Sequence, residues 1–115
     1  MEGAGDLGLT SNQHPSGARV VRVSGEVDLA TVSELQQALA ASGRARPLVV
    51  DLTECTFLDS SGMRLLLAAA AEADAAGESF AIVAGEGGVR RALDIAAVAD
   101  RVPVYVTVAE ALATL

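Results

Sequence analysis

The sequence contains no lysine, and all of its basic residues are arginines. Eight basic residues stand against 15 acidic ones, which gives a formal net charge of -7. An acidic surface repels the phosphates of nucleic acids and of anionic lipids, so we expect neither as a partner. Aromatic residues are also scarce, at 3%. This scarcity argues against a surface that stacks bases or sugars, since such surfaces use aromatic rings.

Cysteine and histidine are each present only once, as Cys55 and His14. A single cysteine cannot form an intrachain disulfide, which fits a reducing cytoplasm. A structural zinc site needs about four ligands, which this pair cannot supply. A serine hydrolase would need a positioned base, and the G-x-S-x-G pattern is absent. Nearby carboxylates should raise the pKa of the Cys55 thiol, so we interpret it as a packing residue. The sequence therefore predicts no metal, no cofactor and no catalytic centre.

Long hydrophobic runs are also missing. The longest apolar stretch, residues 65–71, is too short to span a bilayer. The first residues show neither a basic start nor an apolar h-region, so no signal peptide is expected. What is abundant is small and apolar, because 51% of the 115 residues are hydrophobic. A chain of this length and composition should fold around one core as a single domain.

Predicted strands and helices alternate along the chain. We divide it into an N-terminal segment, residues 1–17, with a possible edge strand at 7–10, and a domain over residues 18–115. Alternation of this kind predicts a largely parallel sheet with right-handed crossovers. The fold class is therefore α/β, with a mixed sheet of about five strands and three to four helices. The further strands are predicted at 18–24, 47–52, 79–84 and 102–106, and the helices at 29–42, 60–76, 88–98 and 107–115.

Helix ends and inward faces can be predicted from residue spacing. Leu29 opens the apolar face of the helix over 29–42. Thr31 and Glu34 have the spacing of a capping box. Thr107 is expected to cap the last helix. In the helix over 88–98, Val89, Leu93 and either Ala96 or Ala97 should face inward.

The run Asp59-Ser60-Ser61-Gly62 lies at the start of a predicted helix, just after a predicted strand. In parallel sheets, functional groups gather at the carboxyl ends of strands. A helix start offers free amides and partial positive charge, so a phosphate on Ser60 or Ser61 would be tolerated. Gly62 leaves room for a partner's backbone to approach. The same residue types are also ordinary helix caps, and both interpretations stand at this point.

Three segments resemble the signature of STAS domains of bacterial anti-sigma factor antagonists. The first runs Val50-Asp51-Leu52 and then Phe57-Leu58-Asp59-Ser60-Ser61-Gly62-Met63. The second is Gly25-Glu26-Val27-Asp28, just before a predicted helix. The third is Val89-Arg90-Arg91-Ala92-Leu93. The resemblance covers about residues 18–115, in the order that the family shows. The loop Ala84-Gly85-Glu86-Gly87-Gly88 departs from the family, which more often has a polar residue and proline there.

The resemblance implies a binding module rather than an enzyme. Such an antagonist binds an anti-sigma factor that is also a serine kinase, and so releases a sigma factor. The resemblance places the phosphorylated serine at Ser60 and implies a PP2C-type phosphatase that removes the phosphate. It implies partner-binding roles for Asp28, Asp59, Ser61, Gly62 and Met63. For Asp28 and Asp59, turn and cap roles are an equally good interpretation.

Three other functions have some support in the sequence. Gly85, Gly87 and Gly88 follow a predicted strand, but Arg90 stands where a dinucleotide fingerprint has its third glycine. A small phosphotransfer enzyme could use Asp28, Asp51 and Asp59 as an acidic pocket, but it would also need a lysine. Within the STAS family, a non-catalytic scaffold subunit of a stress-sensing or lipid-transport complex is the main alternative. The pair Arg90-Arg91 is typical of a solvated helix face that could also meet an acidic partner.

Overall fold

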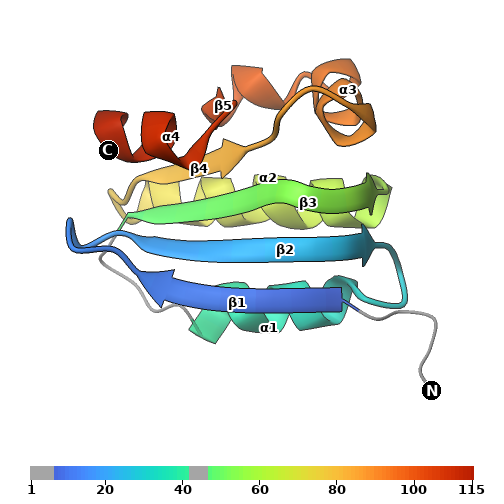
Figure 1. The fold of residues 1–115 in the computed structure, drawn as a ribbon, viewed down its shortest axis with the longest axis horizontal. Helices are drawn as coiled ribbons and strands as arrows, with labels where there is room; N and C mark the ends of the chain where they lie inside the picture. Colours follow the sequence, from blue (N-terminus) through green and yellow to red (C-terminus); the bar gives the residue numbers. More distant parts are fainter. Residues whose placement is uncertain (1–6, 42–46) are drawn as a thin grey trace.

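A mixed sheet forms the centre of the fold (Figure 1). The computed structural model describes residues 7–41 and 47–115. In these residues the sheet has five strands in the order β1-β2-β3-β4-β5. The strand β1 pairs antiparallel with β2, and all other pairs are parallel. The predicted α/β class and mixed sheet are confirmed. The bounds are β1 Leu7–Gln13, β2 Arg19–Val27, β3 Leu48–Leu58, β4 Phe80–Val83 and β5 Val104–Tyr105.

The predicted edge strand is present and is longer than expected. It continues past Thr10 to Gln13, and it pairs with β2 from Leu7 opposite Gly25 to Gln13 opposite Arg19. The hairpin turns at Pro15 to Gly17, where Gly17 has a φ of 97°. That left-handed conformation is one that glycine adopts without steric cost.

Strand β3 is the longest element of the sheet and was predicted too short. It was expected to end near Leu52, but it continues to Leu58. Its second half pairs with β2, with Gly25 opposite Cys55 and Val27 opposite Leu58, across two register shifts. The segment Thr53–Leu58 has no continuous apolar run, because only Cys55 and Leu58 are buried in it. A strand exposed on one side gives a weaker sequence signal than the fully buried first half.

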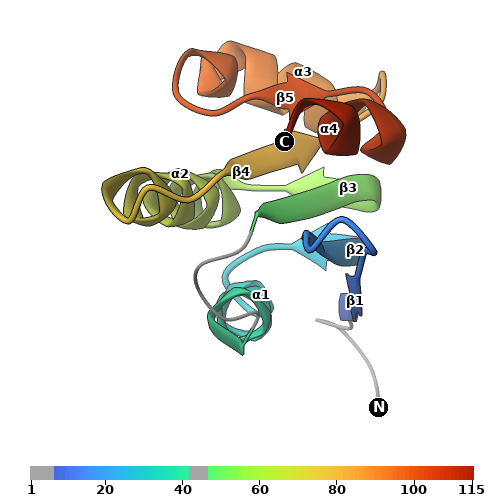
Figure 2. The same cartoon turned by 90° about the vertical axis from the view of Figure 1, so that its left-hand side faces the viewer.

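Two helices lie side by side on one face of the sheet, α1 Val32–Ala41 and α2 Ser60–Ala75 (Figures 1 and 2). The helix α3, Gly88–Ile95, contacts β3, and α4, Val108–Thr114, contacts β3, β4 and β5. A 3-10 turn at Val98–Asp100 follows α3. None of the helices in the described residues has the length and apolar character needed to cross a membrane.

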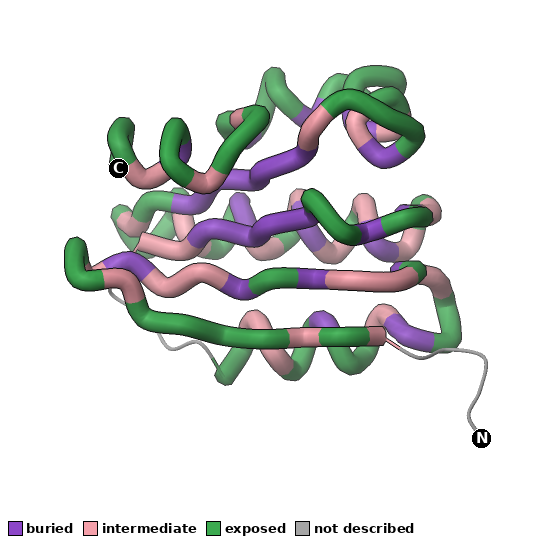
Figure 3. Tube along the Cα trace, viewed as in Figure 1, coloured by how far each residue is buried: buried purple, intermediate pink, exposed green. Residues whose placement is uncertain are grey.

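The sheet is buried on both faces at its centre. On the first face, Val21, Val50 and Ile82 pack with Leu35 of α1 and Leu66 of α2. On the other face, alternate residues of the same strands, together with Ala111 of α4, form a smaller cluster of Val49, Ala81, Val83 and Ala111. Figure 3 shows buried residues concentrated on β3 and β4, whereas β1 is mostly exposed. The central strands are therefore a rigid platform that fixes where each strand ends.

Two predicted helix boundaries were wrong. The first helix begins at Val32, not at Leu29, and its predicted end at Ser42 lies outside the described residues. The third ends at Ile95, because Ala97 adopts a left-handed φ of 55° that interrupts the helix. As a result Ala96 and Ala97 are exposed, and Val98 takes the predicted inward place.

Candidate functional site

The carboxyl ends of β2 and β3 lie side by side and bring two carboxylates together. Val27 and Leu58 are register partners, and the backbone N–H of Asp59 donates to the carbonyl of Val27 at 3.1 Å. Asp28 and Asp59, the residues that follow the two strands, are therefore neighbours at this edge of the sheet. Only Asp59 separates β3 from α2, so the predicted short loop is reduced to one residue.

Asp59 is the N-cap of α2. Its Oδ1 atom accepts hydrogen bonds from the Ser61 amide at 2.9 Å, the Gly62 amide at 3.1 Å and the Ser61 hydroxyl at 2.5 Å. The Ser61 hydroxyl is the main cause that lowers the pKa of the Asp59 carboxyl, helped by the two amides and by the Arg64 guanidinium. Asp59 is thus an ionised cap at neutral pH and a poor acceptor for a further proton.

The two serines after Asp59 are in different situations. The Ser61 hydroxyl is held by the cap carboxylate, and its side chain is partly buried. Ser60 is exposed, and its hydroxyl has no hydrogen-bond partner among the residues that the structure describes. An incoming electrophile can therefore reach the Ser60 oxygen without breaking a contact of the fold.

Gly62 and Met63 face the protein's own interior. Gly62 is buried, and a Cβ atom there would lie 2.6 Å from Leu58 Cδ1 and 2.7 Å from Val27 Cγ1. The missing side chain therefore makes room for Leu58 and Val27, and not for a partner's backbone as the sequence had suggested. Met63 is partly buried against the same core cluster. A partner could touch only what remains exposed of these two residues.

Asp28 and Thr31 build the turn from β2 into α1. The Asp28 Oδ1 atom accepts from the amides of Ala30, at 2.9 Å, and of Thr31, at 3.2 Å. The buried Thr31 hydroxyl donates to the Glu26 carbonyl at 2.8 Å and accepts from the Asp28 amide. The predicted capping box between Thr31 and Glu34 was therefore wrong, because the threonine points back toward β2.

Two large apolar side chains flank this edge in exposed positions. Leu29, expected to face inward, is 79% exposed, because the turn at Asp28 delays the start of the helix. Phe57 is 49% exposed near the end of β3, opposite Glu26. Sequence spacing pointed to neither of them as a surface residue. Phe57 could have been identified from its neighbour Leu58, because adjacent strand residues point to opposite faces and only one of the two can enter the same core.

The alternative acidic pocket does not form. Asp51 lies within β3, opposite Arg22 and not at the strand's carboxyl end. It is buried, and it pairs with Arg22 Nε at 3.2 Å and with the Thr53 amide at 2.9 Å. The distance along β3 from Asp51 to Leu58 is about 23 Å at the usual rise per residue. Within the described part of the chain, no three His, Cys, Asp or Glu side chains are grouped as metal ligands.

Most of the remaining polar candidates make contacts within the fold. Burial raises the pKa of the Cys55 thiol, which donates to the Phe57 carbonyl at 3.2 Å. Arg90 donates to the Ala84 carbonyl at 2.8 Å and so holds the glycine-rich loop to α3. Arg91 is exposed. His14 Nδ1 lies 2.8 Å from Ser16 Oγ in the hairpin turn.

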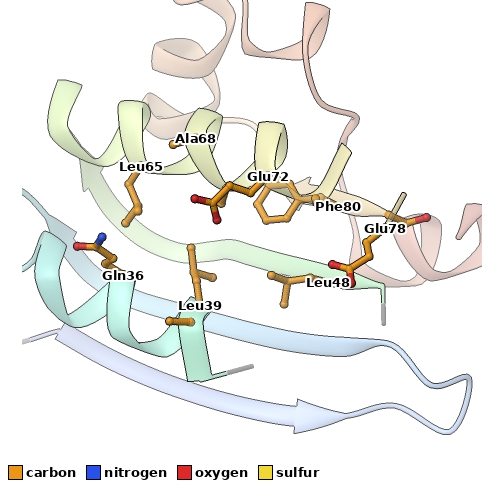
Figure 4. Close-up of a pocket in the computed structure, with 12 residues that line it drawn as sticks. Gln36, Leu39, Leu48, Leu65, Ala68, Glu72, Glu78 and Phe80 are labelled. Carbon is orange, nitrogen blue, oxygen red and sulfur yellow. The ribbon is translucent and has the colours of Figure 1, made fainter. Parts of the chain in front are cut away.

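A groove of about 340 Å³ lies at the opposite edge of the sheet (Figure 4). Leu39 of α1 and Leu65 of α2 line its sides, and Leu48 and Phe80 line its floor at the first residues of β3 and β4. Its labelled polar side chains are Gln36, Glu72 and Glu78 (Figure 4). Ser60 is not among the residues that line it.

The chain is similar to known proteins over most of its length. The family model described as "Mlab, STAS domain" matches residues 10–107. The anti-sigma-F factor antagonist RsfB of Mycobacterium tuberculosis, in strains CDC 1551 / Oshkosh and ATCC 25618 / H37Rv, is 29% identical over 116 residues. The match covers 97% of this chain and 92% of the relative.

Solved structures show the same fold. A crystal structure of an anti-sigma factor antagonist from Mycobacterium paratuberculosis matches with a TM-score of 0.87 and 28% identity, over 99% of this chain and 97% of that one. A putative antagonist from Thermotoga maritima matches with a TM-score of 0.80 at 14% identity, over 92% of each chain, which shows the fold alone. The chain belongs to the STAS domain family.

Proposed function

We propose that this protein is an anti-sigma factor antagonist, a non-catalytic binding module of the cytoplasm that is switched off when Ser60 is phosphorylated. Its partner is an anti-sigma factor that is also a serine kinase, and binding releases a sigma factor. The observation that carries the proposal is the exposed, unpartnered Ser60 hydroxyl beside a fully engaged cap, within the residues that the structure describes. The names of the M. tuberculosis and M. paratuberculosis relatives support the same function.

The surface around Ser60 has the character of a docking site. Leu29 and Phe57 offer exposed apolar area near the two strand ends, and exposed aromatic and aliphatic anchors often carry binding energy. Asp28 and Asp59 add negative charge, so the partner surface should be apolar with a basic rim. Exposed parts of Ser61 and Met63 would lie inside the contact, whereas Gly62 is buried beneath them.

The phosphorylation step needs nothing catalytic from this chain. The Ser60 oxygen attacks the γ-phosphorus of the kinase's ATP, the bond to the bridging oxygen breaks, and ADP leaves. We expect the serine proton to go to a base of the kinase, because Asp59 Oδ1 already accepts three hydrogen bonds and the pKa of this carboxyl is lowered. A PP2C-type phosphatase would later hydrolyse the phosphate monoester and restore the hydroxyl.

The added phosphate should break the complex. It adds bulk to a tight contact surface, and its charge of about -1.5 to -2 would have to be desolvated against the apolar part of the partner and beside Asp28 and Asp59. Loss of about 4 kcal/mol of binding free energy weakens affinity roughly a thousandfold. No nucleic acid or membrane takes part in this mechanism.

The test compares partner affinities by calorimetry. Ser60→Asp should weaken binding to the anti-sigma kinase by up to about a thousandfold, and Ser60→Ala should preserve it. Ser79→Asp is the matched control, because it adds the same charge at an exposed serine at the opposite edge of the sheet. After incubation with the kinase and ATP, mass spectrometry should find phosphate on Ser60.

Two results would defeat the switch. One is phosphate on Ser61 or Thr56, and the other is equal affinity for the Ser60→Asp and Ser60→Ala variants. Equal affinities would favour the scaffold function in a stress-sensing or lipid-transport complex. Stable aspartyl phosphate after incubation with magnesium and acetyl phosphate would favour a phosphotransfer enzyme instead.

A further inference from the structure

Arg64 lies one helical turn after Ser60 on the same face of α2. The helix runs without interruption from Ser60 to Ala75. Residues four apart on a helix have Cβ atoms about 5–6 Å apart, and their long side chains meet. Both Ser60 and Arg64 are exposed, so both side chains point to solvent and neither is held in the core.

The Arg64 side chain is available to form a new ion pair. Among the described residues it makes no ion pair or hydrogen bond through its side chain, whereas Arg22 is paired with Asp51 and Arg90 with Asp94. Arg64 nevertheless lies close to the start of α2, because it is the fifth residue of this helix, and its positive charge helps to lower the pKa of the Asp59 carboxyl. A cation that is near this end of the helix and otherwise unpaired can receive a new anion there.

A phosphate on Ser60 would need such a cation. The Ser61 and Gly62 amides, which a helix start normally offers to an anion, already donate to Asp59. The nearby carboxylates of Asp59 and Asp28 repel a phosphate. The four-residue spacing leaves Arg64 as the side chain of α2 placed to supply both counter-charge and hydrogen-bond donors. Arginine presents planar N–H pairs that suit phosphate oxygens.

We propose that Arg64 pairs with the phosphoryl group on Ser60, so that the phosphorylated protein holds its own phosphate against the first turn of α2. This regulation rests on the proposed phosphorylation of Ser60. The ion pair exists only in the phosphorylated form. It fixes the phosphate over the docking edge and at the same time withdraws Arg64 from contact with a partner.

The test measures the second pKa of the phosphate by 31P NMR titration of the full chain, with phosphoserine placed at position 60 during translation. A nearby guanidinium favours the dianion and lowers this pKa. Arg64→Gln should therefore raise it by about 0.3 to 0.5 unit, the size expected for an i, i+4 ion pair with a phosphate. Arg64→Lys should restore part of the shift. Asp28 and Asp59 act equally in every variant.

Arg91→Gln is the control, because Arg91 is an exposed arginine on α3. It should leave the phosphate pKa unchanged. The proposal is overturned if Arg64→Gln leaves the pKa at its original value, or if Arg91→Gln raises it by the same amount. Because the phosphoserine is introduced by translation, this outcome does not depend on whether a kinase modifies Ser60. The two proposals can therefore fail separately.

Discussion

Helices α2 and α4 both begin at a side-chain cap, but the two caps differ in what they leave free. At α4, Thr107 accepts from the Glu110 amide, and the Glu110 carboxylate accepts from the amides of Thr107 and Val106. Both side chains of that box therefore accept hydrogen bonds from backbone amides. At α2, the Asp59 side chain accepts hydrogen bonds from two amides and from the Ser61 hydroxyl, whereas the Ser60 hydroxyl takes no part in the cap.

The difference shows that capping and function are not competing interpretations of Asp59-Ser60-Ser61-Gly62. Asp59 and Ser61 form the cap, which orders the first turn of α2. Because that turn is ordered without Ser60, the Ser60 hydroxyl is presented in a fixed place at no cost to the fold. At α4, by contrast, both side chains of the capping box bind the backbone at the helix start.

The largest expected effect concerns the glycine in the first turn of α2. Gly62→Val should destabilise the protein by about 1–3 kcal/mol more than Gly88→Val, since overpacking a core costs about that much. The new side chain would collide with Leu58 and Val27, whereas a Cβ atom on Gly88, at the start of α3, would meet nothing within 4 Å. Urea denaturation measures both. Equal losses would mean that the start of α2 can relax, and that Gly62 is not needed for packing.

Much of the fold could be predicted from local patterns. The helix from Ser60 and the cap at Thr107 follow from apolar spacing and short-range hydrogen bonding, and both are confirmed. The exposure of Leu29 could not be read from spacing, because the Asp28 turn moves the helix start by three residues. The second half of β3 was missed because its order comes from pairing with β2 and not from its own sequence.

The site was predictable only in part. Spacing placed Asp59, Ser60 and Ser61 at the start of a helix, but both serines follow the same aspartate. Which hydroxyl the cap uses depends on side-chain direction, which the sequence does not encode locally. The role of Gly62 was misread for the same reason, since the direction of its absent Cβ toward Leu58 is a tertiary property.

A smaller effect should separate the capping residues from Ser60. Asp59→Ala and Thr107→Ala should each lower the free energy of unfolding by about 1 kcal/mol, the usual cost of losing a cap. Ser60→Ala should stay within about 0.5 kcal/mol of the parent, as surface changes do. Thermal and urea unfolding of the three variants measure this. A Ser60→Ala loss as large as the Asp59→Ala loss would show that Ser60 belongs to the cap after all.

The smallest effect is a pH dependence confined to α2. The pKa of the Asp59 carboxyl is lower in the folded state than in the unfolded state. The ionised carboxyl therefore contributes its full stabilisation above the unfolded pKa of about 3.9, and this stabilisation is lost as the pH falls through the folded pKa.

Asp59→Asn should keep most of the cap at neutral pH, because asparagine also caps well. The variant should not show the loss of stability that protonation of Asp59 causes in the parent. We therefore expect the stabilities of the parent and the variant to converge as the pH is lowered below about 4. A difference that stays constant from about pH 7 to about pH 3, on either side of that value, would mean that the charge of Asp59 contributes nothing, and that the start of α2 depends on neutral hydrogen bonds alone.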